Sequence, residues 1–80
     1  RASGQRSMTM RIIDTLLHGF GDEGGRNDKL AKFVGGLLFR AVDDEVVVQL
    51  ARLANVNSPN PLPEKEMMRT VESMIKKDRR

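Results

Sequence analysis

The stretch GDEGGRNDKLAKFVGGLLFR, residues 21–40, joins a glycine-rich loop directly to the clearest helical pattern in the chain. Its apolar residues recur at positions i, i+3, i+4, i+7 and i+8, which places them on one face of a helix. These residues are Leu30, Phe33, Val34, Leu37 and Leu38. Gly35 and Gly36 lie inside the pattern and cost about 1 kcal/mol each relative to alanine. Their presence predicts that another helix packs closely against this one.

Helical patterns also occur on both sides of this stretch. Apolar residues recur at helical spacing over residues 8–20, which predicts a first helix from about Ser7 to His18. Ser7 or Thr9 is placed to cap the beginning of this helix, and Gly19 is placed to end it. The sequence therefore predicts a helix before the glycine-rich loop as well as after it.

Two further helices are predicted in the second half of the chain. The acidic run at residues 43–45 marks the start of a third helix, because carboxylates stabilise a first turn. The buried stripe of this helix is predicted to comprise Val46, Val47, Leu50, Leu53 and Ala54. A loop rich in Asn, Ser and Pro follows over residues 55–61. Pro63 is predicted to be the first residue of a fourth helix, where its missing N–H costs nothing.

The fold class that follows is all-α, a small bundle of about four helices, because the sequence shows no alternating strand pattern. Eighty residues leave room for one hydrophobic core, so residues 1–80 are predicted to form a single helical domain. The predicted core includes Ile13, Leu16, Leu30, Phe33, Leu37, Leu50, Leu53, Val71 and Ile75.

Composition narrows the class of protein. The chain has no cysteine, which excludes disulfides and thiolate metal sites and favours an intracellular setting. It has no apolar run of about 18 residues, so no membrane span is expected. Residues 1–6 have no initiator Met and no apolar signal core, so we expect the chain to be a fragment of a longer protein.

The net charge is +3, and the C-terminal residues account for the excess. The cations there are Lys76, Lys77, Arg79 and Arg80. They either complement the dipole of the last helix or attract a polyanion such as a nucleic acid.

The glycine-rich loop has two interpretations. A phosphate-binding P-loop requires a Lys-Ser/Thr pair between a strand and a helix, and this stretch has neither. The simpler interpretation is a helix cap, in which Asn27 accepts from free N–H groups while Gly24 and Gly25 let the chain reverse. Arg26 is not explained by a cap. It either braces the loop or contacts phosphate.

The sequence does not predict catalysis, a metal or a cofactor. His18 has no evident partner, and Ser73 lacks a histidine base that would make it a nucleophile. The acids at residues 22, 23 and 28 lack the ligand spacing of a calcium loop.

Two segments, GGRNDKLAKFVGGLL and NVNSPNPLPEKEMMRTVESMIKK, together resemble the primase C-terminal helical domain of phage and plasmid replication proteins. The family pattern is matched by Gly24 or Gly25, Arg26, Asn27, Leu30, Asn57, Pro61, Leu62, Glu66, Val71, Ser73 and Met74 or Ile75. The resemblance covers about residues 21–77. Pro63 departs from it, since the family often has a Ser or Thr cap there, and Asn55 competes with Asn57 for one family position.

The resemblance implies that the parent is a DNA primase of a bacterial, archaeal or phage-infected cell, and therefore cytoplasmic. Catalysis would belong to a neighbouring domain, and a helicase domain would be a further partner within the parent protein. The module would then help to engage the single-stranded template or the initiating nucleotide. The first candidate contacts are Arg26 and Asn27, with Lys29, Lys32 and Arg40 on the same helix and Lys76, Lys77, Arg79 and Arg80 in the tail.

Two other classes of function stay open. The first is a structural or protein-interaction module that spaces primase and helicase domains, because single-strand binders usually stack bases on aromatic rings and few are available here. Phe39 lies off the core stripe and is the candidate for stacking. The second is a helix-turn-helix reader of duplex DNA, for which the third helix offers Gln49 and Arg52.

Overall fold

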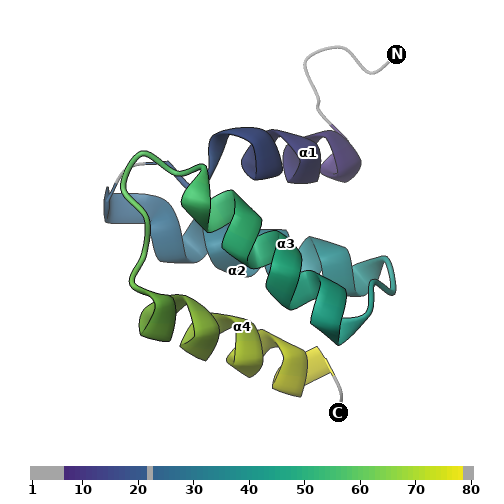
Figure 1. Ribbon diagram of the computed structural model, residues 1–80. Helices are drawn as coiled ribbons and strands as arrows, with labels where there is room; N and C mark the ends of the chain where they lie inside the picture. The colour runs from purple at the N-terminus through teal and green to yellow at the C-terminus, as the bar shows by residue number, and fades with distance from the viewer. Residues whose placement is uncertain (1–6, 22, 79–80) are drawn as a thin grey trace.

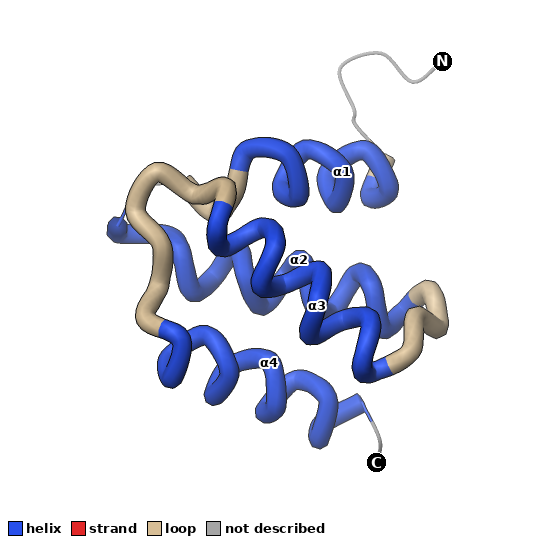
Figure 2. Tube along the Cα trace, in the orientation of Figure 1, coloured by secondary structure: helices blue, strands red, loops and turns tan. Residues whose placement is uncertain are grey.

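The computed structural model describes residues 7–21 and 23–78, which form four α-helices (Figure 1). These are α1 (Met8–His18), α2 (Arg26–Phe39), α3 (Asp44–Val56) and α4 (Glu64–Asp78), with a short 3-10 turn, η1 (Glu23–Gly25), before α2. The described residues contain no strand (Figure 2). The structure thus confirms the all-α bundle that the periodicity predicts.

Helix α2 is the centre of the bundle. It packs against each of the other three helices, and α3 also contacts both α1 and α4. Helices α1 and α4 lie on opposite sides of the α2–α3 pair (Figure 1). Because α2 is covered from several directions, its apolar stripe supplies much of the core, including Leu30, Phe33, Val34, Leu37 and Leu38.

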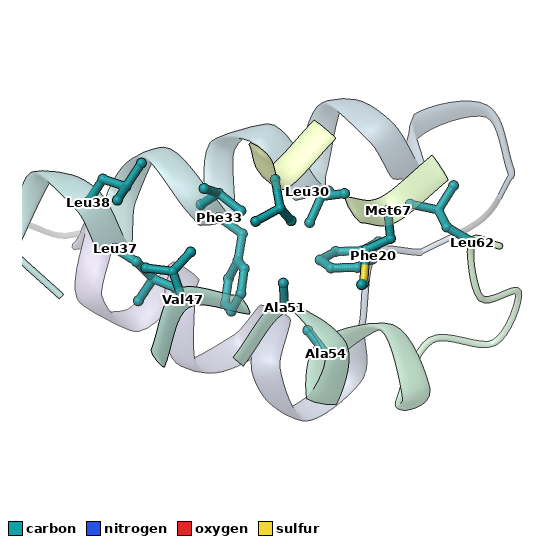
Figure 3. Packing of buried hydrophobic residues seen from close by; sticks show 12 residues of the cluster. Phe20, Leu30, Phe33, Leu37, Leu38, Val47, Ala51, Ala54, Leu62 and Met67 are labelled. Carbon is teal, nitrogen blue, oxygen red and sulfur yellow. The ribbon is translucent and has the colours of Figure 1, made fainter. Parts of the chain in front are cut away.

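The core contains one aromatic residue that lies outside any helix. Phe20, in the loop after α1, is fully buried, and its ring meets that of Phe33 edge to face at a centroid distance of 6.1 Å (Figure 3). Met67 and Val71 of α4 are also fully buried in this core. The loop after α1 is therefore anchored by a large apolar side chain.

The predictions that Ile13, Val46 and Leu53 are buried are wrong. Ile13 is 43% exposed, Val46 is 41% exposed and Leu53 is 47% exposed. Helix α1 instead packs through Ile12 and Leu16, and α3 packs through its neighbouring stripe of Val47, Ala51 and Ala54. The other predicted core residues are confirmed as buried or as packed against the core.

The diglycine of α2 confirms close packing at one of its two positions. A Cβ on Gly36 would lie 3.0 Å from Cδ1 of Ile12 and 3.4 Å from Sδ of Met8, so α1 approaches the α2 backbone there. A Cβ on Gly35 would make an ordinary contact, 3.4 Å from Cε of Met74. Close packing therefore favours glycine at position 36 more than at position 35.

The chain does not reverse where the sequence predicts. Gly19 and Gly21 have φ values of 85° and 81°, whereas Gly25 has a φ of −126°, which other residues readily adopt. A Cβ on Gly24 or Gly25 would have no described atom within 4 Å. The predicted role of Gly24 and Gly25 in the reversal is wrong, because the turn is made before η1.

The beginnings of the last two helices agree closely with prediction. Helix α3 has Asp44 and Glu45 in its first turn, where their negative charges interact favourably with the helix dipole. Helix α4 begins at Glu64, one residue after the predicted Pro63. The carbonyl of Pro63 accepts a hydrogen bond of 3.0 Å from the N–H of Met67.

Candidate nucleic-acid interface

Arg26, the first residue of α2, is attached to the loop that leads into α4. Its Nη1 donates to the carbonyl oxygens of Asn60 and Pro61, at 2.8 Å and 3.1 Å. Its Nε is buried and has no hydrogen-bond partner among the described residues. The sequence left two roles for Arg26, bracing the loop or contacting phosphate, and these hydrogen bonds are those of a loop brace.

Asn27 is not the cap of α2, so that prediction is wrong. The helix begins at Arg26, which leaves the N-cap position to Gly25 and places Asn27 in the first turn. The Asn27 Oδ1 accepts a hydrogen bond of 2.8 Å from Oγ1 of Thr70 instead. The amide therefore links α2 to α4 and is engaged within the fold.

The loop between α3 and α4 is held by further side chains. The buried Asn55 donates from Nδ2 to the Leu62 carbonyl at 2.9 Å, and its Oδ1 accepts from the Leu62 N–H at 2.8 Å. The Asn57 Nδ2 donates to the Leu16 carbonyl at 2.8 Å. Both asparagines that compete for the family position thus stabilise the loop, but Asn55 does so from the interior.

Ser58 joins the same loop to the turn after α1. Its hydroxyl accepts from the Phe20 N–H at 2.8 Å and donates to the Ala54 carbonyl at 3.0 Å. Sequence reasoning missed Ser58 and the role of Asn55, because their partners are backbone groups that no residue pattern reveals.

The remaining cations of α2 lie on its exposed face. Lys32 pairs with Asp28 at 3.3 Å, but both side chains are more than 70% exposed, so the pair contributes little. Lys29 is also exposed, and Arg40 donates from Nη1 to the Gly36 carbonyl at 3.1 Å. Lys29 and Lys32 are therefore available to an anion without loss of a core contact.

These cations border two neighbouring hollows. The first, of about 310 Å³, lies between α1 and α2 and is lined by Arg11, Lys29 and Lys32 together with the carboxylates of Asp14 and Asp28. The second, of about 570 Å³, is lined by Lys32, Phe39 and Arg40 and by apolar residues of α1, α2 and α4. Met8 and Lys32 line both hollows, so the two hollows are neighbours on the surface.

Arg11 is a cation that sequence reasoning missed. It lies one turn after Met8 and beside Ile12, so it shares the side of α1 that faces α2. In the sequence, only its helical spacing from Met8 indicates that the two side chains share a side of α1. This spacing places Arg11 beside α2 only when the packed face of α1 is known.

The predicted basic tail is partly described. Lys76 and Lys77 lie in the last turn of α4, where cations complement the helix dipole, and Arg79 and Arg80 lie outside the described residues. A shallow surface hollow brings Asp78 together with the acidic start of α3, residues 43–45. The end of α4 therefore lies beside the acids that begin α3.

The single histidine of the chain lies at the end of α1. Its Nε2 is 3.7 Å from the Asp14 Oδ1, one helical turn earlier. Over residues 7–21 and 23–78, no group of three or more His, Cys, Asp or Glu side chains is placed to hold a metal ion. Within the same residues, none of the helices is both long and apolar enough to cross a membrane.

The family model described as Primase C terminal 1 (PriCT-1) matches residues 14–80. The chain therefore belongs to the primase C-terminal family, as its two motifs indicate. The match begins inside α1 and includes α2, α3 and α4, so it covers most of the bundle. No curated protein and no solved structure matches the chain.

Proposed function

We propose that this chain is a non-catalytic helical module of a phage- or plasmid-type DNA primase, and that it helps to engage the single-stranded template or the initiating nucleotide. Primer synthesis itself is then the task of a neighbouring primase domain, with a helicase domain as a further partner in the parent protein. The family membership supports the primase context. The proposal for the template rests on the surface of the domain.

The observation that carries this proposal is the cationic face of Arg11, Lys29, Lys32 and Arg40 along the two neighbouring hollows. These four cations outnumber the two carboxylates there, Asp14 and Asp28. Cations that neutralise phosphates release counterions and so supply affinity that does not depend on sequence. A primase must engage many different template sequences, which suits this kind of contact.

This interface differs from the one that the sequence indicates. Arg26 and Asn27 are hydrogen-bonded within the fold, to the loop before α4 and to Thr70. The proposed interface therefore excludes Arg26 and Asn27. It comprises Lys29, Lys32 and Arg40 at α2, together with Arg11 of α1.

The test is titration of the chain with a fluorescein-labelled oligothymidylate at several salt concentrations. The double variant Lys29→Ala/Lys32→Ala should weaken binding and reduce the slope of log K against log salt by about 0.7 for each lost phosphate contact. The matched control, Lys65→Ala/Arg69→Ala, removes the same charge from exposed positions on α4. Equal losses in both double variants would contradict a defined interface on α2.

A second function, spacing of the neighbouring domains, is favoured by a different observation. Leu17 and Val56 are 62% and 73% exposed, on two helices that contact each other. A neighbouring domain would cover such side chains. If this is the main function, Leu17→Lys/Val56→Lys should impair the parent primase while the binding of oligothymidylate by this chain is unchanged.

The duplex-reader alternative is weaker. Arg52 donates to Oε2 of Glu64 at 2.8 Å and 3.1 Å, which ties its guanidinium to the start of α4. Helix α3 also exposes Val46, Leu53 and Val56, and apolar side chains of this kind do not read the hydrogen-bonding edges of bases.

A further inference from the structure

We infer that the larger hollow binds an unpaired nucleobase of the single strand, stacked on the ring of Phe39. We call this hollow the diglycine groove and define it by Met8, Gly35, Gly36, Phe39, Arg40 and Met74. The inference rests on the proposed function, since it names the part of the template that the domain would recognise.

The floor of the groove is open because α2 has glycine at two successive positions. Gly36 is explained by α1, whose Ile12 and Met8 side chains would lie only 3.0 Å and 3.4 Å from its Cβ. Gly35 is not explained in this way, because a Cβ there would make an ordinary contact with the flexible end of Met74. Alanine would also favour the helix. The missing side chain at Gly35 therefore leaves space that the fold does not need.

The groove also has an aromatic wall without a partner in the core. Phe39 is 87% exposed, whereas Phe20 and Phe33 are buried against each other. Every base offers a π face, so an exposed ring beside an apolar floor binds bases with little regard to sequence. The thioethers of Met8 and Met74 are polarisable and adapt to a flat aromatic ligand.

Charge identifies the occupant as nucleic acid rather than an apolar peptide or a second copy of this chain. Lys32 lines both the cationic hollow of Arg11 and Lys29 and the groove, and Arg40 follows Phe39 directly. A base on Phe39 would thus have cations on both sides for its flanking phosphates. The single strand would follow the α1–α2 hollow and place one base in the diglycine groove.

The experiment compares two strands that carry the same phosphates. The chain is titrated at low salt with an oligothymidylate and with an abasic strand of equal length. We expect the oligothymidylate to bind at least about 5-fold more tightly, since stacking on one aromatic ring contributes about that much. Phe39→Leu should abolish this difference while leaving binding of the abasic strand unchanged.

A fluorescent variant gives a second, direct measurement. The chain has no tryptophan, so Phe39→Trp introduces a single reporter, which a stacked base should quench and an abasic strand should not. The matched control is Leu17→Trp, an exposed position on α1 that does not line the groove. Gly35→Ala should raise the melting temperature and weaken binding of the oligothymidylate, because its methyl group fills part of the floor.

The possible outcomes separate the two proposals. Preference for the base-bearing strand, lost in Phe39→Leu and reported by Phe39→Trp, supports the inference. Equal binding of both strands overturns the inference but leaves the proposed function intact, whereas binding of neither strand at low salt overturns both the inference and the proposed engagement of the template. Self-association of the chain that depends on Phe39 would show that a second copy occupies the groove, and would also overturn the inference. Should Phe39→Leu fail to fold, quenching in Phe39→Trp decides alone.

Discussion

Arg26 and Asn60 are joined by a hydrogen bond of 2.8 Å from the Arg26 guanidinium to the Asn60 carbonyl, across 34 positions of sequence. The bond connects the beginning of α2 to the loop before α4, and the Pro61 carbonyl accepts from the same nitrogen. A glycine-rich stretch followed by an arginine at a helix start is typical of anion sites. Here the arginine binds backbone oxygens of its own chain instead.

The first prediction follows from this contact. Arg26→Ala should lower the free energy of unfolding by about 1–3 kcal/mol, as expected for hydrogen bonds made by a charged donor, and Arg26→Lys should lose less. Urea denaturation measures the change, with Arg69→Ala as a surface control that stays within about 0.5 kcal/mol of the unchanged chain. Full stability of Arg26→Ala together with a lower affinity for single strands would show that Arg26 contacts phosphate after all.

The second prediction distinguishes Asn55, in the last turn of α3, from Asn57, which follows the helix. Asn55→Ala leaves both the N–H and the carbonyl of Leu62 without their buried partner, so it should cost about 2–3 kcal/mol. Asn57→Ala removes one bond at an exposed site and should cost about 0.5–1.5 kcal/mol. Chemical denaturation of both variants tests the order. A larger loss at Asn57 would contradict it.

The third prediction concerns the turn after α1. Gly19 has φ 85° and ψ −165°, a region that essentially only glycine occupies, and its Cβ would lie 2.3 Å from the Cα of Ser58. Gly19→Ala should therefore cost more than about 2 kcal/mol. Gly24→Ala, where the added Cβ is in open space, should change stability by less than about 0.5 kcal/mol. Thermal melting compares them, and similar melting temperatures would refute the assigned turn.

The fourth prediction tests the packing of two helices. Leu37→Ala should lower the free energy of unfolding by about 2–5 kcal/mol, because Leu37 is 4% exposed in the core. Ile13→Ala should cost much less, since Ile13 is 43% exposed on α1. Equal losses in urea denaturation would mean that α1 packs through the face that the sequence indicates.

The fold was largely predictable from periodicity, but the packed faces of α1 and α3 were not. On α1, the pair Ile12 and Leu16 and the pair Ile13 and Leu17 both satisfy the helical spacing, so the pattern alone does not choose between them. On α3, the large side chains of Val46 and Leu53 are exposed, whereas the small side chains of Ala51 and Ala54 are buried. Small side chains let neighbouring helices approach closely. A pattern of hydrophobic residues does not reveal this, because alanine is only weakly hydrophobic.

The candidate site was predictable only within one helix. Lys29 and Lys32 lie on α2 and Arg40 caps its end, so helical spacing alone is enough to relate them. Arg11 lies beside these cations only because α1 packs on α2. Arg26 is not part of the site, because its guanidinium is hydrogen-bonded to a backbone carbonyl far along the chain. Contacts to backbone carbonyls depend on where the chain passes, and residue types do not specify that path.

The last prediction separates two roles for Asn27. As a link between helices, its bond with Thr70 makes the two residues interdependent. Asn27→Ala and Thr70→Val should each cost about 0.5–1.5 kcal/mol, and the double variant should cost less than their sum by about 0.5–1 kcal/mol. Urea denaturation of all four proteins in the cycle gives the coupling. Strict additivity would mean that Asn27 acts within its own helix, as a cap would, because a cap bond is indifferent to Thr70.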